Sequence, residues 1–104
     1  MKRFLVVFLS LILATPAGAS RLVVSHKVME MTRGVAVCET GMANEHGPRF
    51  YGRIGWRPAT WVAFRRPDFP SRMDWATWKQ QAWAMARFAA VYGWPDQSGC
   101  TGGY

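Results

Sequence analysis

The chain has 104 residues, of which 50% are hydrophobic and 14% aromatic, with two cysteines and a formal net charge of +7. This length allows one domain. The apolar content excludes intrinsic disorder, because it provides enough burial to offset the conformational entropy of the chain.

An export signal is predicted at residues 1–19. Residues 2–3 are basic, residues 4–14 are apolar, and residues 17–19 supply the small side chains that signal peptidase requires. The apolar stretch would form a helix of roughly 16 Å, about half the hydrocarbon thickness, so a membrane span is the weaker interpretation. We therefore expect a secreted or cell-wall protein, residues 20–104, with a net charge of +5 and no stable membrane insertion.

Cys38 and Cys100 are the only cysteines. A small exported domain commonly needs a covalent brace, and two cysteines allow one pairing. A Cys38 to Cys100 disulfide closing a loop of about 63 residues would stabilise the fold by roughly 4 kcal/mol. His26 and His46 lack the close pairing of zinc motifs, so we expect no metal and no cofactor.

The first predicted helix begins after Ser25, a good N-cap residue, and ends near Gly41. Apolar side chains recur on one face of this segment, at Val28, Met31, Val35 and Cys38. Gly34 lowers helix stability by about 1 kcal/mol relative to alanine, so a start after Arg33 is the alternative.

A loop with a short strand around Phe50 and Tyr51 is predicted for residues 41–55. Pro58 suits the first position of a short helix, Pro58 to Phe64. The last and clearest helix is expected to have Asp74 as its cap and about eighteen residues, ending at Gly93. Its apolar positions are Trp75, Trp78, Ala82, Met85, Ala89 and Tyr92.

Glu39 is the first candidate for acid–base chemistry. It lies at the C-terminal end of a predicted helix, where the dipole disfavours a negative charge and favours the protonated carboxyl that a general acid needs. A solvated glutamate at a helix end is the alternative interpretation.

Several segments in order resemble the resuscitation-promoting factor family of small lysozyme-like, transglycosylase-like domains. The segments are Val35-Ala36-Val37-Cys38-Glu39-Thr40-Gly41, Phe50-Tyr51-Gly52-Arg53-Ile54-Gly55-Trp56, Thr60-Trp61, Asp74, Ala76-Thr77, Gln80-Gln81, Gly93-Trp94 and Cys100. Together they span about residues 35 to 100. The family pattern has a C-E-S-G start, a Y-Y-G-G-L-Q-F segment, a T-W pair, a Q-Q pair and a G-W ending before a cysteine.

The resemblance implies an α+β, mainly helical, small lysozyme-like fold with one disulfide. It implies that Glu39 is the essential glutamate and cleaves the β-1,4 bond between N-acetylmuramic acid and N-acetylglucosamine. Thr60 and Trp61 would lie near the sugar cleft, Tyr51 would line it, and Tyr92 would replace a polar cleft residue. Core packing is the alternative for Trp61 and Tyr51, because most tryptophans in so small a domain must be buried.

The chain departs from the family pattern around this cleft. Ile54-Gly55 stands in place of the family's L-Q, Arg53 replaces a glycine, and Arg57 occupies a position that is acidic in some members. Two functions are therefore kept: a peptidoglycan glycosidase or lytic transglycosylase, and a non-catalytic peptidoglycan-binding module. A cationic membrane-active protein is a weaker third, because the last helix lacks a basic polar face.

Nine of the eleven basic residues after the signal segment are arginines, which suit bidentate contacts with carboxylates. Between Glu39 and the last helix lie Arg49, Arg53, Arg57, Arg65 and Arg66. We expect the partner to be peptidoglycan glycan strands, with no nucleic acid, and the protein to be a monomer. A merely solvated basic surface is the alternative.

Overall fold

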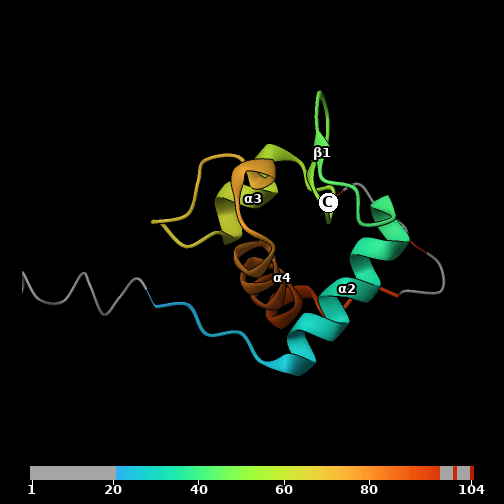
Figure 1. The fold of residues 1–104 in the computed structure, drawn as a ribbon, viewed down its shortest axis with the longest axis vertical. Coiled ribbons are helices and arrows are strands. Elements are labelled where there is room, and N and C mark those ends of the chain that lie inside the picture. Colours follow the sequence, from blue (N-terminus) through green and yellow to red (C-terminus); the bar gives the residue numbers. More distant parts are fainter. Residues whose placement is uncertain (1–20, 97–99, 101–103) are drawn as a thin grey trace, which may run out of the picture.

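The computed structural model describes residues 21–96, 100 and 104, so the predicted signal segment lies outside the described residues. Figure 1 shows a short hairpin projecting from one edge of the group of helices. In chain order the elements are α2 (His26–Thr40), β1 (Glu45–His46), β2 (Tyr51–Gly52), α3 (Pro58–Phe64), the 3-10 turn η1 (Met73–Trp75) and α4 (Trp78–Tyr92). The α+β, mainly helical class is confirmed.

Helix α2 begins where its cap residue predicts. The Ser25 hydroxyl accepts a hydrogen bond from the Val28 amide at 3.1 Å, and the helix continues through Gly34 without interruption. The alternative start after Arg33 is therefore wrong. Gly41 ends the helix in the left-handed conformation, with φ of 65°, and its amide donates to the Val37 carbonyl.

The predicted strand around Phe50 and Tyr51 corresponds to β2, which pairs antiparallel with β1. Gly52 has φ of 82°, and a Cβ there would approach the Met73 side chain to 2.5 Å. Only glycine allows the hairpin to pack this closely on η1. Helix α3 has the predicted bounds and carries Pro58 at its first position.

The start of the last helix differs from the expectation. Asp74 does not cap it; Thr77 does, accepting a hydrogen bond from the Gln80 amide at 3.1 Å while the Gln80 side chain accepts from the Thr77 amide. Trp75 lies in η1, and α4 has 15 residues rather than about eighteen. Asp74 is buried instead, because Arg72 and His46 engage its carboxylate. The predicted end before Gly93 is confirmed.

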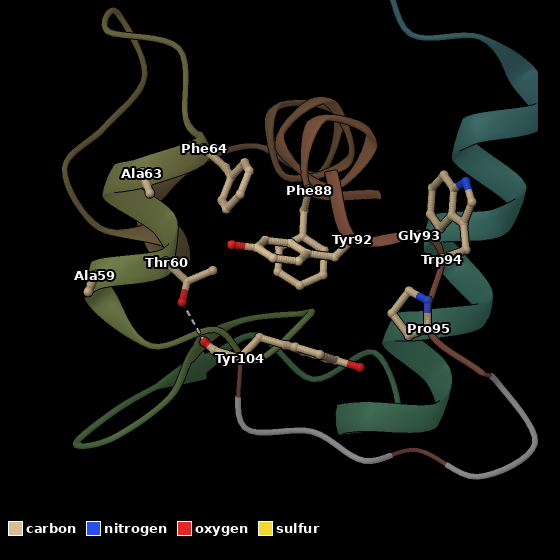
Figure 2. A pocket seen from close by; sticks show the side chains of 10 residues that line it. All are labelled: Ala59, Thr60, Ala63, Phe64, Phe88, Tyr92, Gly93, Trp94, Pro95 and Tyr104. Atoms are coloured by element: carbon tan, nitrogen blue, oxygen red, sulfur yellow. Dashed lines mark hydrogen bonds between the residues drawn. The ribbon is translucent and has the colours of Figure 1, made fainter. Parts of the chain in front are cut away.

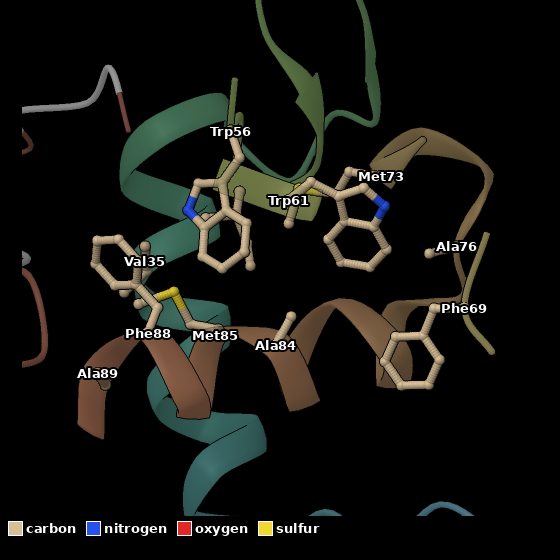
Figure 3. Packing of buried hydrophobic residues seen from close by; sticks show 11 residues of the cluster. Val35, Trp56, Trp61, Phe69, Met73, Ala76, Ala84, Met85, Phe88 and Ala89 are labelled. Atoms are coloured by element: carbon tan, nitrogen blue, oxygen red, sulfur yellow. The ribbon is translucent and has the colours of Figure 1, made fainter. Parts of the chain in front are cut away.

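The core lies where α2, α3 and α4 meet, and Figure 3 shows its aromatic centre. Trp56 packs against Trp61, Phe64 and Phe88, with ring centroids 5.3 to 6.4 Å apart. Gln81 is the buried polar link between α4 and the hairpin loop: its side-chain oxygen accepts from the Arg53 amide at 2.8 Å. The hairpin is thereby fixed to the helical core.

The Cys38–Cys100 disulfide is confirmed, with Cα atoms 5.7 Å apart. It joins the last turn of α2 to the segment that follows α4. Within residues 21–96, no helix has the length and apolar character needed to cross a membrane.

Candidate functional site

Glu39 lies in the last turn of α2, beside the disulfide and partly exposed to solvent. The next residue fixes this helix end: the Thr40 hydroxyl donates to the Arg53 carbonyl at 2.5 Å. A Cβ on Gly55 would meet the Thr40 methyl at 3.2 Å, so the loop after the hairpin lies directly against this turn. The candidate acid is therefore held on rigid backbone rather than on a loop.

A pocket of about 530 Å³ opens between α3 and the end of α4 (Figure 2). Thr60 and Tyr92, both predicted to bind substrate, lie on its wall, and Tyr92 is 70% exposed. The other lining residues are mainly apolar and aromatic: Ala59, Ala63, Phe64, Phe88, Gly93, Trp94, Pro95 and Tyr104. Thr60, Tyr92 and Tyr104 add hydroxyl groups to these aromatic walls, which are suited to stacking against the apolar face of a sugar ring.

Tyr104 connects this pocket with the end of α2. Its main-chain oxygen accepts hydrogen bonds from the Thr60 hydroxyl at 2.7 Å, drawn in Figure 2, and from the Arg57 amide at 3.1 Å. Cys100, four residues earlier, is bonded to Cys38. Glu39 is not among the described residues that line the pocket, so the two features are joined through the chain segment that follows Cys100.

Trp61 and Tyr51 lie away from the pocket, in two different surroundings. Trp61 is 1% exposed, and its indole N–H donates to the Pro70 carbonyl at 2.9 Å. Trp61 therefore packs in the core, which was the alternative interpretation, and it has almost no surface for a ligand. Tyr51 is partly exposed on β2, with the Arg72 guanidinium 4.9 Å from its ring centre.

A charged cluster beside the hairpin was not anticipated from the sequence. Asp74, whose side chain is 1% exposed, accepts from Arg72 Nε at 3.0 Å and Nη2 at 2.7 Å, and pairs with His46 Nδ1 at 2.9 Å. Burial alone would raise the pKa of Asp74, but the hydrogen bonds from Arg72 and His46 hold it below its ordinary value. The Arg72-x-Asp74 spacing was a local signal; His46 is 28 residues away in sequence and gave none.

The five arginines between Glu39 and α4 have different surroundings. Arg53 donates to the Met42 carbonyl, which makes it part of the loop structure. Arg65 donates to the Phe69 carbonyl at 3.2 Å, and Arg66 pairs with Asp68. Arg49 and Arg57 are exposed, so they are the better candidates for contact with an anionic surface.

The described residues contain no group of three or more His, Cys, Asp or Glu side chains that could hold a metal ion. Comparisons with protein-family models, with curated proteins and with solved structures found no match to this chain.

Proposed function

We propose that this chain is an exported peptidoglycan-cleaving domain in which Glu39 is the general acid and base. The observation that carries the proposal is the position of Glu39: partly exposed at the end of α2, which the disulfide and the Thr40 hydrogen bond hold in place. The likeness of the surrounding sequence to the resuscitation-promoting factor family supports the same role. A lysozyme-like fold and export to the cell wall belong to this proposal.

In the proposed reaction, the Glu39 carboxyl donates its proton to the glycosidic oxygen between N-acetylmuramic acid and N-acetylglucosamine. The bond from this oxygen to C1 breaks, and N-acetylglucosamine leaves with a free 4-hydroxyl. The Glu39 carboxylate then removes the proton from the muramic C6 hydroxyl, whose oxygen bonds to C1. The product is a 1,6-anhydromuramoyl end, and Glu39 is again protonated.

Three of the other carboxylates have ion-pair partners in the described part of the chain. Asp74 is buried between Arg72 and His46, Asp68 pairs with Arg66, and Glu30 pairs with His26. Glycosidases that use water normally place a second carboxylate across the scissile bond. Glu45, exposed on β1, is the candidate for that second role.

The pocket between α3 and α4 would bind a sugar of the glycan strand. Tyr92 offers an exposed ring, and Trp94 is partly exposed on the same wall. Stacking on such rings provides binding without chemistry.

A non-catalytic wall-binding module is the second candidate, and one observation favours it. No carboxylate side chain is found among the described residues of the pocket wall. A protein of this kind would bind glycan through the pocket and leave it uncleaved.

Turbidity of purified cell walls separates the two candidates. Wild type should lower the turbidity, and Glu39→Gln should not, while both bind the walls and melt at similar temperatures. Glu30→Gln and Glu45→Gln are the matched controls and should cleave as wild type does. Cleavage by Glu39→Gln would refute the role of Glu39. If wild type bound the walls without cleaving them, the non-catalytic binding module would be the function that remains.

A further inference from the structure

The cluster of Arg72, Asp74 and His46 has unused hydrogen-bonding capacity. A guanidinium has five N–H donors in a rigid plane. Asp74 accepts from Nε and from one N–H of Nη2. No bond within the described chain accounts for the remaining donors, and the Arg72 side chain is 41% exposed.

The remaining donors have the geometry of a second fork. With the Nε and Nη2 edge taken by Asp74, the outer edge keeps one N–H on each terminal nitrogen, parallel and in plane. That pair matches the two oxygens of a carboxylate. The first carboxylate holds the guanidinium in place, so little conformational entropy is lost when a second one binds.

Aromatic rings hold the same guanidinium. Its central carbon lies 4.5 Å from the ring centre of Trp75 and 4.9 Å from that of Tyr51. Trp75 is 61% exposed, so a ligand at the outer edge would also meet an apolar ring.

His46 adds to the same surface. Asp74 accepts the Nδ1 proton, so Nε2 is directed away from the pair, and the side chain is 72% exposed. Nε2 becomes a donor when the ring is cationic. Glu45 precedes His46 on β1. Because consecutive strand residues point to opposite faces, the Glu45 carboxylate lies on the other face of the strand from His46.

We propose that Arg72, held by Asp74 and lying against the rings of Trp75 and Tyr51, binds a ligand carboxylate that adjoins an apolar or sugar face. In a cell wall this chemistry occurs in the lactyl group of N-acetylmuramic acid and in the stem peptide. The choice of wall fragments as probes rests on the proposed function, whereas the carboxylate chemistry does not. Arg72, Trp75 and His46 extend the ligand surface to the hairpin, away from the pocket of Thr60 and Tyr92.

Nuclear magnetic resonance titration of the whole protein tests this site. N-acetylmuramic acid should shift the Trp75 indole signal and the amides of residues 45–46 and 72–76 saturably. N-acetylglucosamine, which lacks the lactyl carboxylate, should not. D-alanyl-D-alanine tests the stem-peptide source; binding of either carboxylate at these signals supports the proposal.

Variants assign the effect to the fork. Arg72→Lys keeps the charge but has no planar fork, and we expect about tenfold weaker binding. Trp75→Ala leaves the Asp74 contacts intact and should weaken binding about threefold. Arg87→Lys is the matched control, because Arg87 also lies over an indole, that of Trp83, but has no ion pair with a carboxylate among the described residues.

Equal shifts by the two sugars, or unchanged affinity in both Arg72→Lys and Trp75→Ala, would overturn the proposal. Shifts confined to the pocket residues would do the same. These outcomes are distinct from failure of the proposed function, because the titration needs no turnover and can be repeated in Glu39→Gln.

Discussion

The pocket between α3 and α4 and the cluster beside the hairpin are organised by different forces. Packing of aromatic rings shapes the pocket, where the Phe88 ring centroid lies 5.3 Å from that of Phe64 and 5.1 Å from that of Tyr104. A buried carboxylate organises the cluster, where Asp74 holds Arg72 and His46. The pocket should therefore respond to loss of the disulfide and of packing, and the cluster to pH.

Removing the disulfide should have the largest effect. Cys38→Ser with Cys100→Ser removes a link between residues 62 positions apart in sequence and should lower the free energy of unfolding by about 4 kcal/mol. Hydrogen exchange should increase around the pocket, because Tyr104 follows Cys100, and less around Asp74. Denaturant titration with exchange mass spectrometry measures both. Two free thiols in the native protein would contradict the disulfide itself.

The local elements could be predicted because their signals are local. Ser25, Pro58 and Gly93 mark helix ends through their own backbone preferences, and the structure uses each of them. The prediction that Asp74 caps the last helix was wrong, because Thr77 and Gln80 form a capping box at the start of α4. A carboxylate suits a cap or an ion pair equally well, and only the tertiary position of Arg72 and His46 decides between them.

The grouping of site residues depended on tertiary structure as well. The resemblance placed Tyr51, Thr60, Trp61 and Tyr92 around one cleft. Thr60 and Tyr92 share a pocket, whereas Trp61 is in the core and Tyr51 lies beside Arg72. Aromatic residues give no sequence signal for burial in a domain with six tryptophans.

The contrast between Trp61 and Tyr92 can be tested directly. Trp61→Phe removes a buried indole and its hydrogen bond to Pro70, and should cost about 2 kcal/mol of stability with wall binding retained. Tyr92→Ala removes an exposed ring, and should cost under about 0.5 kcal/mol while weakening wall binding. Thermal melts and wall pull-downs compare them. If the Trp61→Phe variant were stable but failed to bind walls, Trp61 would have a role in glycan binding.

Acid should act through the cluster. Because the pKa of Asp74 is lower in the folded chain than its ordinary 3.8, its stabilising contribution is present above about pH 4 and is lost as pH falls through the folded value. Asp74→Asn should cost about 1.5 kcal/mol at neutral pH and reduce this acid dependence. Urea titrations between pH 7 and 2 measure it. If the Asp74→Asn variant lost as much stability at low pH as wild type, other carboxylates would cause the acid dependence.

Salt should give the smallest effect. Wall binding is expected to weaken from low salt to about three times physiological ionic strength. Because Arg53 donates to the Met42 carbonyl, Arg49→Gln and Arg57→Gln are the variants to compare, and each should reduce the salt dependence. Pull-down on insoluble wall across the salt series measures this. A constant bound fraction would mean that these charges form only a solvated surface.

Mass spectrometry of fragments released from purified walls tests whether Glu39 is both the acid and the base of the reaction. Wild type should release fragments with 1,6-anhydromuramoyl ends and Glu39→Gln should release none, because Glu39 alone supplies acid and base. Anhydro and reducing ends differ by one water. Release of the same fragments by Glu39→Gln would refute this role of Glu39. If wild type released only reducing ends, a second carboxylate would activate water, and Glu45 would be the first to test.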